Sequence, residues 1–337
     1  MYKGFIGAVT IPLMIILAGP VSAQNSGEFY KGKTISLVIG FGGGGTYDFY
    51  GRLVARHLGK HLPGKPNVIV QSMPGGGSFT AANYMYSVAP KDGTVIGIVT
   101  QTLAIEEKLG TQGVRFEAAK FNWIGRATSI NQVTLASPFV KSIDDAKGRE
   151  VALASTGAGS PSESYPKLLN ALAGTKFKLV GPYVSSSEAM LALERGEVEG
   201  ALTSWSTLKA TKGEWLAQKK INILVQYAMA RSPELSDIPT GVELVQGVEA
   251  KEMMTFALSG EEVGRSFFAP PDVPATQIEL LRAAFDAMTK DPEVLNEVAR
   301  AKAEFVPLSG SKLQDLISSV DRASPSMVSK LKTLLQP

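Results

Sequence analysis

Apolar residues early in the chain change from one spacing to another. Thr34–Ile39 is a β-rich run of strand length, whereas the apolar residues between positions 48 and 62 recur at steps of three and four, as on one face of a helix. A run of glycines separates the two segments, and Pro63-Gly64 ends the second. The pattern predicts a unit of strand, glycine loop and helix.

The same unit is repeated further along the chain. Residues 67–71 form a second strand-like run, residues 73–78 a second glycine loop and residues 79–88 a second helix, and a third strand is expected at 94–100. Strands that alternate with helices indicate a mainly parallel sheet with helices on both faces. Ligands of such sheets bind beyond the carboxyl ends of the strands, which is where both glycine loops lie.

A second α/β segment begins near residue 132. The elements expected in it are strands at 149–154, 178–180 and 221–227 and helices at 162–173 and 188–195. After Pro233 the composition is loop-like, a strand is expected at 266–269, and amphipathic helix predominates from residue 274. The whole pattern predicts an α/β fold.

Composition narrows the function classes. The chain has 337 residues, enough for about two domains, and 44% hydrophobic with 19% charged residues is typical of a folded globular protein. Lysines and arginines are scattered and the formal net charge is +3, which argues against nucleic-acid binding. Cysteine is absent, which excludes a disulfide scaffold and a lipid anchor on a cysteine.

The first residues are typical of a secretory signal peptide. Lys3 supplies a positive charge, residues 5–17 are almost entirely apolar, and Val21-Ser22-Ala23 has the small-x-small pattern that precedes cleavage. A membrane anchor is the alternative, but the apolar stretch is shorter than the roughly 20 residues of a spanning helix. We therefore predict removal of residues 1–23 and a periplasmic protein, in a compartment where nicotinamide cofactors and nucleoside triphosphates are scarce.

The first glycine loop suggests a nucleotide site at first sight, because Gly40, Gly42 and Gly45 have the spacing of a dinucleotide fingerprint. No lysine follows the last glycine, as a phosphate loop requires, and Gln71-Ser72 stands where the fingerprint needs an acidic residue. We therefore expect no nucleotide and no cofactor. Glycine loops followed by helices also present backbone N–H groups and a positive dipole end, which favour a small carboxylate. Tight turns without a ligand are the alternative.

Asp48, in the first turn of the helix, complicates an anion site. Its carboxylate stabilises the helix start but repels an incoming anion. It either caps the helix while facing away from the ligand or accepts a hydrogen bond from a ligand hydroxyl or ammonium group. The sequence leaves both alternatives open.

Other constellations carry less weight. His57 and His61 have a spacing that can hold a metal, but no third ligand is evident and basic neighbours favour a solvated helix end, so no metal is expected. No Gly-x-Ser-x-Gly elbow and no cysteine is present, so no catalytic residue is assigned; a secreted hydrolase acting on an acidic substrate remains an alternative. Trp205 directly follows Thr203-Ser204, at the end of a predicted strand, and is the tryptophan best placed to meet a ligand.

Several short motifs occur in a fixed order along the chain. They are Gly43-Gly44-Gly45-Thr46 with Asp48 and Arg52-Leu53, Met73-Pro74-Gly75-Gly76-Gly77 with Ala89-Pro90-Lys91-Asp92-Gly93-Thr94, Gly159-Ser160-Pro161-Ser162, Pro182-Tyr183, Arg231-Ser232-Pro233-Glu234-Leu235-Ser236-Asp237-Ile238-Pro239-Thr240 and Phe268-Ala269-Pro270-Pro271. This set resembles the extracytoplasmic solute receptors of tripartite tricarboxylate transporters, also called the Bug family. The resemblance covers nearly all of the chain after residue 23.

The chain also departs from the family pattern. Tyr47 is an extra residue between the loop threonine and Asp48, and Gly42 stands where the family usually has proline. Val184-Ser185 replaces the usual Lys-Gly pair, and Glu163 replaces a common histidine. These changes surround the inferred pocket, so the ligand can differ from that of better-known members.

The resemblance implies a type II-like periplasmic binding protein with two mainly parallel sheets flanked by helices and a ligand cleft between two domains. Domain I would comprise residues 24–125 and 231–337, and domain II residues 126–230, with closure about a hinge. The expected function is capture of a small organic carboxylate, by a monomer, for delivery to the membrane subunits of a tripartite tricarboxylate transporter. Presentation of the ligand to a sensor kinase is the alternative use.

The resemblance also implies a set of ligand-binding residues. In the family, ligand carboxylates meet backbone N–H groups and hydroxyls more than arginines, and no obligatory arginine is expected here. The residues expected at the site are Gly43, Gly44, Gly45, Thr46, Tyr47, Asp48, Pro74, Gly75, Gly76, Gly77, Ser78, Thr100, Thr102, Ser160, Ser162, Tyr183, Ser186, Ser187, Thr203, Ser204 and Trp205.

Overall fold

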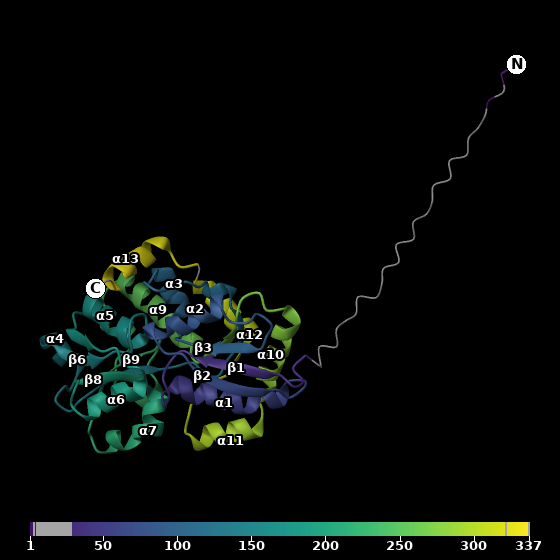
Figure 1. Ribbon diagram of the computed structural model, residues 1–337. Coiled ribbons are helices and arrows are strands. Elements are labelled where there is room, and N and C mark those ends of the chain that lie inside the picture. Colours follow the sequence, from purple (N-terminus) through teal and green to yellow (C-terminus); the bar gives the residue numbers. More distant parts are fainter. Residues whose placement is uncertain (3, 5–28, 321, 336–337) are drawn as a thin grey trace.

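The computed structural model describes residues 1, 2, 4, 29–320 and 322–335. The predicted signal peptide lies outside the described residues except for Met1, Tyr2 and Gly4. The described residues form two lobes that lie side by side, each built around one β-sheet (Figure 1). None of the helices in this part of the chain is both long and apolar enough to cross a membrane.

The sheet of the first lobe has the strand order β11-β4-β10-β3-β1-β2. Its strands are β1 (Thr34–Ile39), β2 (Asn67–Ser72), β3 (Val95–Ile98), β4 (Asn122–Arg126), β10 (Ser266–Ala269) and β11 (Leu308–Ser309). β1 lies parallel to both β2 and β3, so that Leu37 is opposite Val70 on one side and Ile96 on the other. β10 is antiparallel to β3 and to β4.

The sheet of the second lobe has the strand order β7-β6-β8-β5-β9. Its strands are β5 (Gln132–Ala136), β6 (Val151–Ala154), β7 (Phe177–Val180), β8 (Gly200–Ser204) and β9 (Asn222–Tyr227). β6 is parallel to β7 and β8, whereas β5 is antiparallel to β8 and β9.

The α/β fold with two sheets is confirmed, but both sheets are mixed rather than mainly parallel in their pairing. The reversed strands are β10 and β11 in the first sheet and β5 in the second. β5 follows β4 after the short link 127–131, which carries the chain from one sheet to the other. No strand–helix–strand crossover precedes β5 in its own sheet, so the rule that makes such strands parallel does not apply to it.

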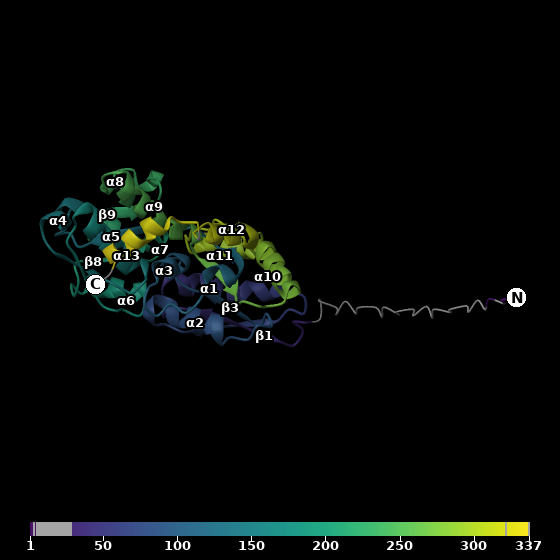
Figure 2. The same cartoon turned by 90° about the horizontal axis from the view of Figure 1, so that it is seen from above.

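Helices cover both sheets. They are α1 (Thr46–His61), α2 (Phe79–Ser87), α3 (Leu103–Leu109), α4 (Ile143–Gly148), α5 (Pro161–Ala173), α6 (Ser186–Glu194), α7 (Trp205–Ala217), α8 (Gly241–Leu244), α9 (Val248–Val263), α10 (Ala275–Met288), α11 (Pro292–Arg300), α12 (Gly310–Val320) and α13 (Pro325–Leu335). Single 3₁₀ turns are formed by Gly76–Ser78, Ala118–Lys120 and Pro233–Leu235. The C-terminal helix α13 lies over α5, α3 and α9 and so bridges the two lobes (Figures 1 and 2).

The hydrophobic core is continuous from one lobe to the other. One cluster of buried side chains contains Trp123 and Phe268 of the first sheet together with Leu153 and Tyr227 of the second. A buried aromatic or aliphatic side chain of this size stabilises a fold by about 1.5–3 kcal/mol. The lobes are therefore packed against each other along one side, and the polar site described next occupies the remaining part of the interface.

Candidate functional site

A small cavity of about 40 Å³ lies between the lobes. It is lined by Phe41, Gly42, Gly45, Thr46, Tyr47, Gln132, Thr156, Pro161, Ser162, Ser185, Ser186, Leu202, Thr203, Ser204 and Arg265. Most of these residues carry a hydroxyl group or present bare backbone, and Arg265 is the charged residue among them. The cavity is only large enough for a few water molecules, so the lobes are in a closed arrangement around it.

Within the described residues, four helices begin at this cavity. α1 of the first lobe starts after Gly45, and α5, α6 and α7 of the second lobe start after Ser160, Ser185 and Ser204. Each helix start carries N–H groups without an intrahelical partner and a partial positive charge. Their convergence from both lobes produces a site for an anion, since a carboxylate is bound at a helix start as readily as a phosphate.

The caps of these helices differ in a way that matters for a ligand. Ser185 and Ser204 cap α6 and α7 with their own hydroxyls, which accept hydrogen bonds from the backbone N–H groups of Glu188 and Thr207. No side chain caps α1 after Gly45 or α5 after Ser160. The first N–H groups of α1 and the N–H of Ser162 in α5, whose first residue Pro161 has none, are therefore the ones best placed to meet a ligand from opposite lobes.

Arg265 is the buried cation of the site. Only 1% of the residue is exposed, and its guanidinium lies 3.9 Å from the centre of the Tyr47 ring. One terminal nitrogen donates to Gln101 Oε1 and the other to Thr46 Oγ1 at 3.1 Å, while Nε has no hydrogen-bond partner among the described residues. The opposite face of Tyr47 stacks on Phe41 with ring centres 4.3 Å apart, which fixes the aromatic ring between the two side chains.

Glu261 lies behind the cavity, joined to Arg265 through Gln101. Glu261 Oε1 accepts a hydrogen bond from Gln101 Nε2 at 2.5 Å and another from the hydroxyl of Tyr165, whereas Oε2 has no partner among the described residues. Burial raises the pKa of Glu261 to about 8, although these hydrogen bonds and the charge of Arg265 oppose the rise. The carboxyl group is therefore mostly protonated at neutral pH.

Asp48 is turned away from this cavity. Its Oδ2 accepts a hydrogen bond from the Gly44 N–H at 3.0 Å, and its Oδ1 accepts one from Arg52 Nε at 2.7 Å. Asp48 does not line the cavity but a second hollow of about 460 Å³, which shares Gly45 and Thr46 with it. Of the two alternatives left open by the sequence, the structure favours the one in which this carboxylate faces away from the bound anion.

Comparison with known proteins identifies the family of this chain. Residues 51–332 match the sequence pattern of the protein family described as the tripartite tricarboxylate transporter family receptor. The chain belongs to this family. The match includes both sheets except β1, together with α5, α6, α7 and Arg265.

Relatives of the receptor family extend over nearly the whole chain. A UPF0065 protein of Bordetella bronchiseptica is 23% identical over 312 residues, which cover 90% of this chain and 84% of the relative. The solved structure of Rpa4515 of R. palustris with adipate has a TM-score of 0.68 at 21% identity and covers 90% of this chain and 98% of its own. MatC of Rhodopseudomonas palustris with bound malate has a TM-score of 0.66 at 19% identity, with coverage of 90% and 99%. At these identities the solved structures establish the fold.

The residues expected from the receptor family fall into two groups. Those that line the cavity are Gly45, Thr46, Tyr47, Ser162, Ser186, Thr203 and Ser204. Those that do not line it are Gly43, Gly44, Asp48, Pro74, Gly75, Gly76, Gly77, Ser78, Thr100, Thr102, Ser160, Tyr183, Ser187 and Trp205. The first glycine loop thus lines the cavity, and the second packs beside it.

Several residues of the second group instead hold the lobes together or pack within one lobe. Thr102 Oγ1 donates to the carbonyl oxygen of Gly159 at 2.6 Å, and Ser187 Oγ donates to that of Gly44. Trp205 does not line the cavity, and its Nε1 donates to Glu234. The contact groups of these residues are therefore already satisfied by the protein in the closed arrangement.

Reasoning from the sequence missed part of the lining. The unexpected residues are Phe41, Gly42, Gln132, Thr156, Pro161, Ser185, Leu202 and Arg265. Half of them directly adjoin expected residues; of these, Gly42 and Ser185 are among the departures from the family pattern around the pocket. Gln132 is the polar first residue of β5. Arg265 had no such signal, because it lies beyond the end of α9 and reaches Thr46 across 219 positions of sequence.

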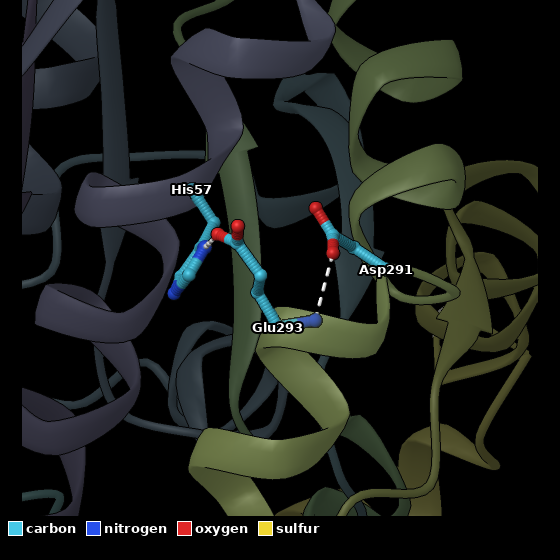
Figure 3. A group of neighbouring side chains, drawn as sticks. All are labelled: His57, Asp291 and Glu293. Atoms are coloured by element: carbon cyan, nitrogen blue, oxygen red, sulfur yellow. Dashed lines mark hydrogen bonds and ion pairs between the residues drawn. The ribbon is translucent and has the colours of Figure 1, made fainter.

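The two histidines lie elsewhere, on the side of α1 that faces α11. His57, Asp291 and Glu293 come close enough to suggest a cation site (Figure 3). However, His57 Nε2 lies 2.8 Å from Glu297, His61 Nε2 lies 3.0 Å from Asp291, and Lys60 donates to Glu293. The group is explained by ion pairs between α1 and α11.

The expectation of a solvated helix end is wrong for His57, which is only 6% exposed. The sequence contained no signal for this burial, because the carboxylates that cover the residue come from α11, more than two hundred positions away.

Proposed function

We propose that this protein is a periplasmic solute receptor that captures a small organic carboxylate between its lobes and delivers it to the membrane subunits of a tripartite tricarboxylate-type transporter. The observation that carries the proposal is the convergence of four helix starts from both lobes on one cavity that also contains Arg265. Related folds hold malate and adipate, which are carboxylates.

The proposed receptor acts by closure of its lobes. Domain I comprises residues 24–125 and 231–337, and domain II residues 126–230, with the chain crossing between them at a hinge. Hydrogen bonds across the cleft support this mechanism: the Gly42 N–H donates to the Val184 carbonyl oxygen at 3.1 Å, and Thr102 donates to Gly159. Opening along these contacts admits the ligand, and closure removes it from water.

Binding without turnover fits the chemistry of the cavity. Neither of the two histidines of the chain lines it, and its many hydroxyls lie beside no imidazole that could accept a proton from them. The receptor is proposed to act as a monomer after removal of residues 1–23. Its ligand-binding set is the expected residues Gly45, Thr46, Tyr47, Ser162, Ser186, Thr203 and Ser204, completed by Gln132 and Arg265.

A thermal-shift panel tests the binding proposal directly. The panel contains acetate, malate, adipate, citrate and benzoate, each beside its neutral amide. A carboxylate at about a hundred times its dissociation constant should stabilise the fold by about 2.7 kcal/mol, whereas the amide should not. A panel without any carboxylate-specific shift would contradict the proposal.

Use of the bound acid is tested separately. The acid should be recovered chemically unchanged after prolonged incubation with the protein, because conversion would indicate a hydrolase. Deletion of the gene should abolish uptake of the acid that binds. Loss of a signalling response with uptake intact would instead indicate presentation to a sensor kinase.

A further inference from the structure

Arg265 is held in place by groups that carry no negative charge. Its terminal nitrogens donate to the amide oxygen of Gln101 and the hydroxyl of Thr46, and its flat face lies on the Tyr47 ring. A buried cation is costly unless an anion neutralises it. Nε, which has no acceptor in the part of the chain that the structure describes, is a further donor in the same guanidinium.

The position of Arg265 indicates where this anion comes from. Arg265 lines the cavity onto which α1, α5, α6 and α7 direct their positive ends. The other lining residues are uncharged. Anything that enters the cavity therefore meets one full positive charge and several partial ones, all buried away from screening by salt.

Among the acidic residues of the protein, Glu261 would be expected to neutralise the positive charge of Arg265. No direct ion pair links them in the described part of the chain, and Gln101 lies between them with one hydrogen bond to each. The groups that face Glu261 are Tyr165 from α5, Tyr47 from α1, Tyr227 from β9 and Arg265 itself. Three of these are neutral phenols, so the burial of Glu261 outweighs the one nearby cation and favours a protonated carboxyl group.

We propose that Arg265 forms an ion pair with a carboxylate of the ligand, and that the proton on Glu261 keeps the charge of Arg265 available for it. This inference rests on the proposed function and names the residue that recognises the anion. A guanidinium with a free N–H next to two fixed ones is suited to a carboxylate, which can accept from more than one nitrogen at once. A neutral amide of the same shape leaves the charge uncompensated and is rejected.

The protonation state of Glu261 then regulates the affinity of the protein for a carboxylate ligand. When Glu261 loses its proton, it supplies a negative charge that competes with the ligand for Arg265. Above the pKa of about 8 the protonated fraction falls tenfold for each unit of pH, so the affinity for a carboxylate should fall as the pH rises from about 7 to about 9.5. Glu261→Gln mimics the protonated form and should lose most of this dependence.

Calorimetric titration with malate, adipate and acetate tests the pairing on the wild type, Arg265→Gln, Arg265→Lys and Glu261→Gln. At about pH 6.5 we expect Arg265→Gln to weaken binding at least about 30-fold, Arg265→Lys to lose less, and Glu261→Gln to bind like the wild type. Arg126→Lys is the matched control, because Arg126 is also buried but does not line the cavity. It should leave affinity unchanged.

The outcomes separate this inference from the proposed function. If the wild type binds one of the three acids and Arg265→Gln binds it equally well, the ion pair is overturned and the receptor function stands. If the wild type binds none of these acids and none of the other acids of the thermal-shift panel, both are overturned.

A spectroscopic measurement covers the case in which Arg265→Gln fails to fold. The Nε–H resonance of Arg265, assigned from its absence in Arg265→Lys, should shift on titration of the wild type with acetate. A resonance that stays in place while backbone amides of Ser186 and Thr203 shift contradicts the ion pair.

Discussion

Gly77 of the first lobe lies directly against the carbonyl oxygen of Ala158 in the second lobe, with no room for a Cβ between them. Gly159, the residue after Ala158, is confined in the same way by the first lobe, because a Cβ at Gly159 would overlap the ring of Phe79. The second glycine loop and the loop before α5 are therefore complementary surfaces. Their contact occurs beside the ligand cavity and is made when the lobes are closed.

Gly77→Ala should weaken carboxylate binding by hindering closure. Gly76→Ala is a matched control, because both glycines have a left-handed φ (63° and 53°) and both substitutions strain the backbone by roughly 1–2 kcal/mol. A Cβ at Gly76 meets the other lobe nowhere, whereas one at Gly77 overlaps Ala158. Titration with adipate or malate and small-angle scattering should find weaker binding and a larger radius of gyration for Gly77→Ala alone. Equal behaviour of the two variants would contradict the closing role.

The contact between Gly77 and Ala158 illustrates which features of the fold can be predicted from the sequence. The first strand, the first glycine loop and the helix that follows it were predictable, because their signals lie within thirty consecutive residues. The role of Gly77 was not, since its partner Ala158 belongs to the other lobe. Local sequence patterns identify turns that need glycine, but whether a ligand or another loop occupies the space beside them is decided by packing between distant segments.

Strand β5 of the second sheet was missed for a related reason, and of β8 only the end at Thr203-Ser204 was predicted. β5 begins with Gln132 and β8 ends with Thr203 and Ser204, so neither has a wholly apolar sequence. Both are nevertheless fully buried, because their polar ends line the closed cavity. A functional site at the ends of strands weakens the apolar pattern by which strands are recognised, and it does so where the function lies.

Gln132→Glu should weaken carboxylate binding strongly. The substitution preserves the size of a buried lining residue but places a carboxylate in the cavity, where it repels the ligand and competes for Arg265. We expect at least about a tenfold loss of affinity at neutral pH, since like charges inside an interface cost several kcal/mol. Gln218→Glu, at an exposed position after α7, makes the same change in net charge as a control. Titration of both variants with malate checks the prediction, which fails if the two lose affinity equally.

Glu261→Gln should stabilise the ligand-free protein at alkaline pH. The carboxyl group of Glu261 has a pKa of about 8 in the folded protein, compared with a usual value of 4.5. Below pH 4.5 the group is protonated in both the folded and the unfolded chain, and its contribution to the free energy of unfolding is complete. Between pH 4.5 and 8 the unfolded chain releases this proton while the folded protein retains it, and stability is lost progressively across this range. Glutamine cannot ionise and avoids the loss.

Thermal unfolding of the wild type and Glu261→Gln at a series of pH values measures this difference. The melting temperatures should be similar near pH 4.5 and should diverge up to pH 8, where the variant is favoured by on the order of a few kcal/mol. A constant gap at every pH would show that Glu261 does not titrate in this range.

Thr102→Val should weaken ligand binding more than it destabilises the ligand-free fold, from which it removes the contact with the Thr100 hydroxyl at 2.7 Å. The hydroxyl of Thr102 donates to the carbonyl oxygen of Gly159 at 2.6 Å across the cleft. In the open protein water satisfies that oxygen, but in the closed variant it is buried without a donor, at a cost of roughly 1–3 kcal/mol. Affinity for malate or adipate should therefore fall by about tenfold or more.

Thr102→Ser retains the donor and removes only a methyl group, so it should bind more tightly than Thr102→Val. Because the lost hydrogen bond forms only on closure, the defect should be larger in ligand titrations than in the melting temperature of the free protein; equal affinity of the two variants would mean that this bond contributes nothing to closure.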